Sequence, residues 1–291
     1  RDWSSDVCSS DLFAAVFGTP WAAGVFAWEV VRDRGGNGGG AALAGGAVRL
    51  MACEACAWLG HGVSMACGAR HMAWDAGVAA GFPSARWMLA SAACGVAMGM
   101  LARGFVGLMR RAGEWFGKLR HWWMRPVLGG LIVGGFVLAS GQRGFLGLGM
   151  TPMDPGDPSI VGCFRGDAIP WWSWAAKAAL TVITLASGFR GGEVTPLFFV
   201  GATAGHALGT WMGVPPALMA ATGLVALFAS ASRAPMACGL LGLEMFGWGS
   251  WPCMVVACVV GHWAGPRRGL YACSRVEDAR GVNDVGKSAV G

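Results

Sequence analysis

A glycine-rich turn followed at once by a long apolar run constrains this chain more than any other feature. The stretch GFRGGEVTPLFFVGATAGHALG, residues 188–209, places Glu193, Thr195 and Pro196 between glycines and an unbroken apolar helix pattern. Pro196 suits the first turn of a helix, because proline lacks an N–H that would have no partner there. The glycines before it permit backbone conformations that other residues resist. We therefore expect a polar turn and then a helix that begins near Pro196.

The start of this predicted helix is suited to an anion. The amides of residues 192–195 are expected to point out of the helix start, where aligned peptide dipoles place about half a positive charge. The flanking residues 178–186 and 197–204 are apolar. A polar turn between apolar runs is typical of a broken helix in a membrane protein, the usual construction of a transporter's ion site.

The composition favours a membrane protein over a soluble one. The chain has 291 residues, of which 55% are hydrophobic and only 13% are charged, and its mean hydropathy is +0.51. Such sparse charge is typical of a protein that crosses the membrane several times. The 49 glycines suit close helix packing in lipid. The net charge of +6 lies mostly in loops, so we interpret it as a topology signal and expect no nucleic acid partner.

The apolar runs predict an all-α, polytopic membrane protein. Six Lys or Arg side chains against Glu114 alone, within residues 103–125, indicate that this stretch is cytoplasmic. Several runs are shorter than the roughly 20 residues that a full span needs, so short, tilted or half-crossing helices are expected. The predicted helices are 13–31, 41–68, 86–108, 126–140, 171–187, 196–212, 216–229, 235–246 and 251–262.

Both ends of the chain differ from its middle. Residues 1–12 are polar, rich in Ser and Asp, and resemble translated adapter sequence, so we exclude them from the fold. The membrane domain is expected over residues 13–273, beginning inside a membrane segment and therefore lacking its N-terminal part. Residues 274–291 form a polar tail.

Two distant segments are alike. GTPWAAGVFAWE (18–29) and RAPMACGLLGLE (233–244) share the pattern x-x-P-x-A-x-G-x-x-x-x-E at an offset of 215 residues, and Phe13 and Phe228 extend the match upstream. Chance similarity between helices rich in Ala and Gly is the alternative. Two structural repeats that meet at a shared site are the functional interpretation. We expect the repeated Glu29 and Glu244 to bond nearby backbone.

The ten cysteines are mostly scattered through apolar runs. The only local cluster is Cys53 and Cys56, followed by His61, Cys67 and His71. A zinc site there remains open, but scattered helical thiols are the preferred interpretation, and no metal or other cofactor is predicted.

These motifs resemble the CLC anion channel and transporter family. The loop GGEVTP (191–196) is similar to that of the bacterial fluoride/proton antiporter branch, whereas chloride-type members carry G-x-F-x-P there. Residues 13–30 and 231–247 resemble further family helices, although Arg233 stands where Asn is more usual. GHWAGPRRGLYACSR (261–275) resembles the last helix and places Tyr271 at the family's anion-coordinating tyrosine.

The resemblance also has gaps. The family's gating-glutamate loop, G-R-E-G or similar, is not found in the chain, and the resemblance places it before residue 1. The internal proton glutamate of chloride/proton exchangers corresponds to Val30, beside Glu29. The fluoride branch is known to lack that glutamate as well, so this gap fits the branch.

The resemblance implies a site made of five consecutive residues and one distant one. Its anion-binding residues are Gly191, Gly192, Glu193, Val194, Thr195 and Tyr271. Amides and hydroxyls would replace the water around the ion. Burial favours the neutral form of a carboxyl, so Glu193 can carry a proton, donate to fluoride and couple the two ions. A plain helix cap is the alternative for Glu193. Lys177 and Arg190 are expected to flank the site and attract anions; a solvated loop charge is the alternative for Arg190.

The resemblance therefore implies a secondary transporter that exports fluoride in exchange for protons. The intact protein is expected to be a homodimer in the bacterial inner membrane. A chloride-type channel or exchanger and an inactive fragment are the alternatives within the fold. A membrane enzyme with Glu193 as general acid or base is disfavoured, because the sequence offers no nucleophile–His pair and no metal-ligand spacing on neighbouring turns.

Overall fold

The computed structural model describes residues 13–32, 41–68, 83–121, 123–154, 156–189, 191–267 and 269–270. All regular secondary structure in these residues is helical, which confirms the predicted all-α class. The named helices are α2 (Pro20–Arg32), α3 (Ala41–Ala66), α4 (Ala85–Gly117), α5 (Met124–Ser140), α6 (Ile160–Arg165), α7 (Ser173–Ala186), α8 (Val194–Met212), α9 (Pro216–Ser232), α10 (Pro235–Phe246) and α11 (Trp251–Ala264).

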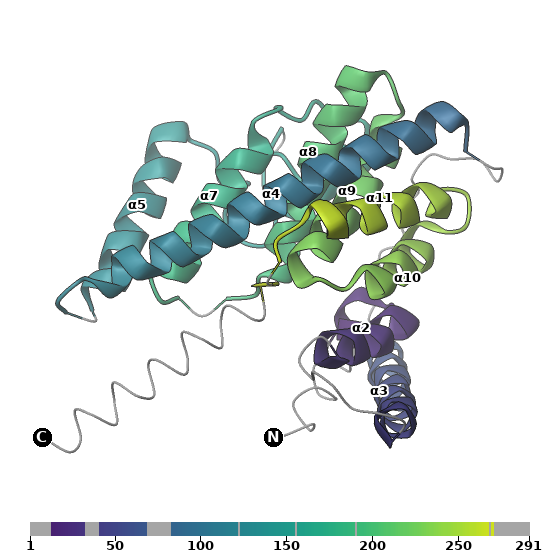
Figure 1. The fold of residues 1–291 in the computed structure, drawn as a ribbon. Coiled ribbons are helices and arrows are strands. Elements are labelled where there is room, and N and C mark those ends of the chain that lie inside the picture. The colour runs from purple at the N-terminus through teal and green to yellow at the C-terminus, as the bar shows by residue number, and fades with distance from the viewer. Residues whose placement is uncertain are drawn as a thin grey trace, which may run out of the picture.

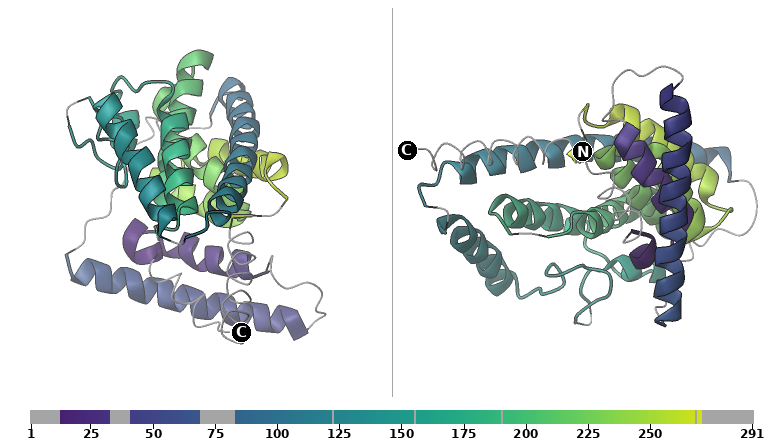
Figure 2. Two further views of the ribbon diagram at one scale, coloured as in Figure 1. Left: turned by 90° about the vertical axis from the view of Figure 1, so that its left-hand side faces the viewer. Right: turned by 90° about the horizontal axis from the view of Figure 1, so that it is seen from below.

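The long helix α4 crosses the whole molecule, with α7, α8, α9 and α11 packed along it (Figure 1). Helix α5 lies at one edge against α7. Helices α2 and α3 form a separate layer below α10, and α3 runs across the base of this layer (Figure 2). By length and composition, α4 is the one helix of the described residues that is long and apolar enough to span a bilayer.

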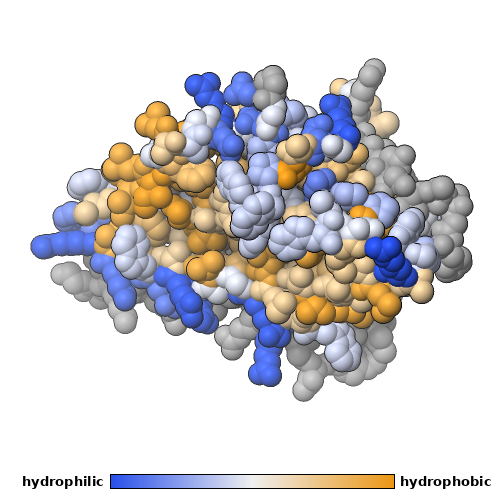
Figure 3. Space-filling model, turned by 90° about the horizontal axis from the view of Figure 1, so that it is seen from above, coloured by the Kyte–Doolittle hydropathy of each residue, from blue (hydrophilic) through white to orange (hydrophobic). Residues whose placement is uncertain are grey.

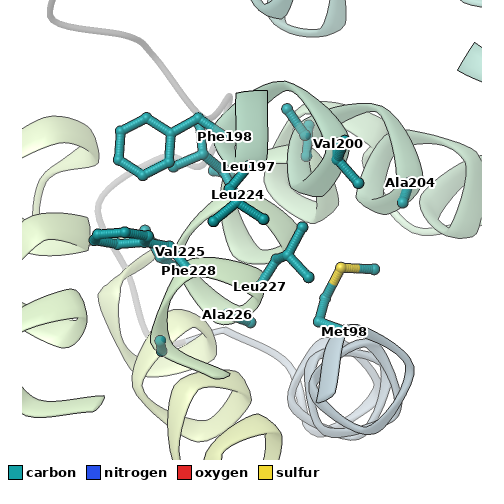
Figure 4. Close-up of a cluster of buried hydrophobic side chains, with 14 of the residues drawn as sticks. Met98, Leu197, Phe198, Val200, Ala204, Leu224, Val225, Ala226, Leu227 and Phe228 are labelled. Carbon is teal, nitrogen blue, oxygen red and sulfur yellow. The ribbon is translucent and has the colours of Figure 1, made fainter. Parts of the chain in front are cut away.

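The core lies where α8, α9 and α4 meet (Figure 4). Leu197 and Phe198 of α8 and Phe228 of α9 are almost fully buried there, as is Met98 of α4. The backbones of α8 and α9 come unusually close, because small residues line both sides of the contact. A Cβ atom on Gly201, for example, would lie 2.6 Å from the carbonyl oxygen of Gly223. This is the small-residue packing expected from the glycine content.

Most predicted helix boundaries agree with the structure within two or three residues. Helix α4 is the main exception, since it extends nine residues beyond the predicted end at Leu108. Its last turns carry Arg110, Arg111 and Glu114. These residues have a high helix propensity but are polar, so the helix continues where the apolar pattern ends. The predicted helix 13–31 is interrupted, because Gly18 adopts a left-handed conformation (φ 70°) before α2 begins.

The two similar segments contact each other reciprocally. The carboxylate of Glu29, near the end of α2, accepts hydrogen bonds from the amides of residues 236–237 at the start of α10 (3.3 and 3.0 Å). The carboxylate of Glu244, in α10, accepts hydrogen bonds from the amides of residues 21–22 at the start of α2 (3.1 and 2.8 Å). Each carboxylate thus caps the partner helix at its N-terminus, where dipole and free amides favour negative charge.

These contacts obey the 215-residue offset, since residues 21–22 correspond to 236–237 and Glu29 corresponds to Glu244. The equivalent rings of Phe13 and Phe228 stack on each other at 6.1 Å. A two-fold relation produces this kind of reciprocity, in which equivalent residues exchange the same contact. The structure therefore supports the inverted-repeat architecture expected from the sequence.

Candidate functional site

The central turn separates α7 from α8. Helix α7 ends at Ala186, Gly188 adopts a left-handed conformation (φ 94°), and α8 begins at Val194 with Glu193 as its N-cap residue. The helix starts two residues before the predicted start at Pro196. Pro196 consequently occupies the third helical position, which is still within the first turn, where an N–H has no partner inside the helix.

The first turn of α8 keeps hydrogen-bond donors available. The first backbone bond of the helix runs from the amide of Leu197 to the carbonyl oxygen of Glu193 (3.2 Å). Among the described residues, no acceptor lies within hydrogen-bond distance of the amides of Glu193, Val194 or Thr195. The exposed Gly191 and Gly192 precede this turn. The structure thus presents a helix start whose donors and positive dipole end can receive an anion.

The side chain of Glu193 does not act as a helix cap in the usual sense. It is half-buried and makes no side-chain capping hydrogen bond. Thr195, one residue into the helix, is also half-buried. Within the described residues, neither the carboxyl of Glu193 nor the hydroxyl of Thr195 forms a hydrogen bond, so both polar groups remain available at the helix start.

A cluster of phenylalanine rings packs beside the first turn of α8. This cluster was not predicted from the sequence. Phe198 lies 5.1 Å from Phe17 and 5.2 Å from Phe228, both measured between ring centroids. Phe26 and Phe13 stack against Phe228 in turn. Apolar rings exclude water and lower the local dielectric, which strengthens any electrostatic interaction at the adjacent helix start.

Tyr271 lies outside the described residues, but the segment that leads to it is well anchored. Arg103 Nε donates to the carbonyl of Gly265 (2.8 Å), and Arg233 Nη1 donates to that of Pro266 (3.0 Å). Leu270 is buried. Arg233 itself caps α9 in a left-handed conformation (φ 64°), an uncommon one for a side chain of this size. These contacts hold the segment against the end of α9, where Gly265 and Gly269 lie close to Ser230 and Ser232.

Lys177 has a different role from the one expected. Its buried ammonium donates to the carbonyls of Phe145 (2.8 Å) and Gly147 (2.7 Å). Its charge therefore stabilises the glycine-rich loop before α6, where a lysine with three donors can satisfy several buried carbonyls. Arg190 lies outside the described residues.

The cysteine cluster is only partly described, since His71 lies outside the described residues. In the part of the chain that the structure describes, no three His, Cys, Asp or Glu side chains come together as a group that could hold a metal ion. Cys53 is buried in α3, whereas Cys67 is exposed beyond the end of that helix.

Comparison with known proteins now identifies the fold. The family model described as voltage gated chloride channel matches residues 13–265. The chain belongs to the voltage-gated chloride channel (CLC) family. Members of this family are membrane proteins that act as transporters or channels.

This CLC chain is similar to proteins whose names mention fluoride. A "Chloride/fluoride channel protein" of Pseudomonas syringae pv. tomato (strain ATCC BAA-871 / DC3000) is 33% identical over 269 residues, which cover 91% of this chain and 56% of that protein. The crystal structure of a CLC-type fluoride/proton antiporter matches with a TM-score of 0.75 and 27% identity, covering 86% of this chain and 60% of that one.

A second solved structure shares the fold at lower identity. It is a slow cyanobacterial Cl⁻/H⁺ antiporter, with a TM-score of 0.65, 19% identity, and coverage of 89% of this chain and 60% of that one. The CLC chain thus spans a little over half of the length of the relatives it matches.

Proposed function

We propose that this CLC chain carries the anion site of a transporter that exports fluoride in exchange for protons. The observation that carries the proposal is the start of α8. There the GGEVTP loop presents unpartnered amides and a half-buried glutamate at the positive end of a 19-residue apolar helix. Two similar proteins support the proposal, since one is named a chloride/fluoride channel protein and the other a fluoride/proton antiporter.

Fluoride makes particular demands on such a site. The ion is small and strongly hydrated, so its transfer into a low-dielectric site is costly unless fixed donors replace its water. The amides of Glu193 and Val194 and the hydroxyl of Thr195 are donors of this kind, and the hydroxyl of Tyr271 is proposed as another. Gly191 and Gly192 leave the backbone of the turn uncovered, so that an ion can approach the amides.

Glu193 is proposed to couple the anion to a proton. An ionised carboxylate at the helix start would repel fluoride, whereas a protonated carboxyl can donate a hydrogen bond to it. Entry of the anion and uptake of a proton would then favour each other at one side chain. This linkage is the physical reason for assigning proton coupling, and it distinguishes the proposal from a simple channel. The opposite directions of the two fluxes are proposed from the similarity to the CLC-type fluoride/proton antiporter.

The intact protein is proposed to act as a homodimer in the bacterial inner membrane, with residues 13–273 inside the bilayer-spanning domain. Chloride transport remains the second candidate within the same fold. The GGEVTP loop favours fluoride over it, because chloride-type members of the family carry G-x-F-x-P at that position.

The test is ion efflux from liposomes that contain the full-length gene product. Fluoride release from loaded vesicles, measured with an electrode, is expected to exceed chloride release by at least about tenfold, the discrimination that one well-placed set of donors can supply. Thr195→Val should slow fluoride efflux, while Thr210→Val, at the other end of the same helix, should not. Equal efflux of both anions would favour the chloride-type candidate instead.

A further inference from the structure

Two pockets follow each other along the α4 and α8 pair. The first, about 420 Å³ in volume, lies between Arg86 near the start of α4 and Met212 at the end of α8. The second, about 310 Å³, begins beside the neighbouring Trp211 and continues to Ala204 of α8, with Met98 of α4 among the residues that line it. Seen from above, the molecule exposes apolar surface between groups of hydrophilic side chains (Figure 3).

We propose that this groove is a binding site for an anionic phospholipid, whose phosphate contacts Arg86 and whose acyl chain fills the second pocket. The site is distinct from the start of α8, which lies at the opposite end of that helix. The proposal does not depend on the transported ion.

The second pocket has the chemistry of an acyl-chain site. All the residues that line it are apolar, and three of them are tryptophans. Trp171 and Trp211 form an exposed rim (62% and 72% exposed), whereas Met98 is almost fully buried (1% exposed). Tryptophan favours the membrane–water interface, with its ring toward the acyl region. The pocket therefore begins at the headgroup level and deepens toward the hydrocarbon.

Arg86 supplies the complementary charge. One nitrogen, Nη2, donates to the carbonyls of Met212 (2.9 Å) and Gly213 (3.3 Å), which fixes the guanidinium over the end of α8. No carboxylate among the described residues forms an ion pair with Arg86. Its other N–H groups thus stay available on an exposed side chain, and the planar guanidinium suits a phosphate.

The spacing of the two parts matches one lipid leaflet. Arg86 and Ala97, the first α4 residue of the second pocket, are separated by 11 residues along the helix. At about 1.5 Å per residue this separation is roughly 16 Å. One leaflet of the hydrocarbon core is about 15 Å deep. A headgroup at Arg86 therefore places its chain alongside the Trp-lined pocket.

The test is lipid binding to the full-length gene product in detergent, followed by native mass spectrometry. The probes are phosphatidylglycerol and phosphatidylcholine with identical acyl chains. Arg86→Gln should weaken phosphatidylglycerol binding about tenfold, the loss expected for a charge-assisted contact. It should weaken phosphatidylcholine binding less, because the choline charge already offsets part of the attraction between that phosphate and Arg86. Arg111→Gln, an exposed arginine near the other end of α4, is the matched control and should have no effect.

A second variant tests the apolar half. Ala207→Phe fills the second pocket and should weaken both lipids. Arg86→Lys keeps a positive charge over the end of α8. If Arg86→Lys still binds phosphatidylglycerol and Arg86→Gln does not, the difference between the two variants isolates the role of the charge. The proposal is overturned if Arg86→Gln and Arg111→Gln bind phosphatidylglycerol equally well, or if Ala207→Phe binds both lipids like the unchanged protein.

Discussion

Replacement of Gly205 by alanine is expected to loosen the α8–α9 hairpin that holds the candidate site. Gly205 lies in the middle of α8 and faces the backbone of α9, where an added Cβ atom would collide with the carbonyl oxygen of Met219. A Cβ atom at the neighbouring Gly201 would also be too close to the backbone of α9, at 2.6 Å from the carbonyl oxygen of Gly223, so α9 cannot retreat from one position alone. The substitution must therefore separate two helices along their length.

Two opposing effects set the change in the free energy of unfolding that Gly205→Ala causes. Alanine in place of glycine favours a helix by about 1 kcal/mol, while overpacking of a tightly packed contact costs about 1–3 kcal/mol and occasionally more. Because backbone is harder to move than side chain, we expect the upper end of that cost and a net loss of about 2 kcal/mol. The corresponding fall in unfolding temperature is about 4–8 °C for a domain of roughly this size.

The assay is thermal unfolding of the purified protein in detergent, with all variants scanned at the same rate. Gly104→Ala, in α4, is the matched control, since a Cβ atom there would have nothing within 4 Å. It should leave the unfolding temperature unchanged or raise it slightly. If Gly205→Ala unfolds no earlier than Gly104→Ala, the close approach of α8 and α9 is wrong.

Three further predictions concern the repeat, the buried lysine and the tyrosine. Glu29→Ala and Glu244→Ala should each lower the free energy of unfolding by about 1–3 kcal/mol, because each leaves two amides without an acceptor. The unfolding temperatures of the two variants should fall by similar amounts. A large difference between them would argue against reciprocal capping. Lys177→Met should expose the loop around Gly147 to limited proteolysis, whereas an unchanged digestion pattern would contradict its role as an anchor. Tyr271→Phe should slow fluoride efflux from liposomes without lowering thermal stability, and full efflux would remove Tyr271 from the site.

The sequence predicted the helices of the central region well, because their limits are marked by local signals. Proline stands at the first positions of α9 and α10, and glycine follows the last residue of α8, so these ends depend on residues next to them. Helix α6 was missed. It has only six residues, too few for an apolar period. Its local signals are the N-cap Ser159, whose hydroxyl accepts from the amide of Gly162, and Gly166 in the left-handed conformation at its end.

Contacts between distant residues were harder to predict. The repeat indicated that Glu29 and Glu244 are equivalent, but not that each would cap the other's helix more than 200 residues away. Lys177 precedes the GGEVTP loop in the chain, yet its ammonium is held by carbonyls about 30 residues upstream. A partner's position depends on the tertiary fold, and no pattern around a single residue contains it.

The same distinction applies to the site. A run of glycines before a proline was enough to predict a helix start with free amides, because the donors belong to the backbone itself. The phenylalanine cluster beside it draws Phe17, Phe198 and Phe228 from three segments. It became visible only once those segments were packed together.

The most direct test of the central claim is a simultaneous recording of fluoride efflux and proton uptake by Glu193→Gln in liposomes. Glutamine retains the size and polarity of the side chain but cannot exchange a proton. We expect both fluxes to fall together by at least about tenfold, as loss of a group used only during transport would cause, while Glu114→Gln, an exposed glutamate of α4, leaves both unchanged. Coupled fluxes at the original rate in Glu193→Gln would contradict the proposed role of Glu193 and of the site at the start of α8.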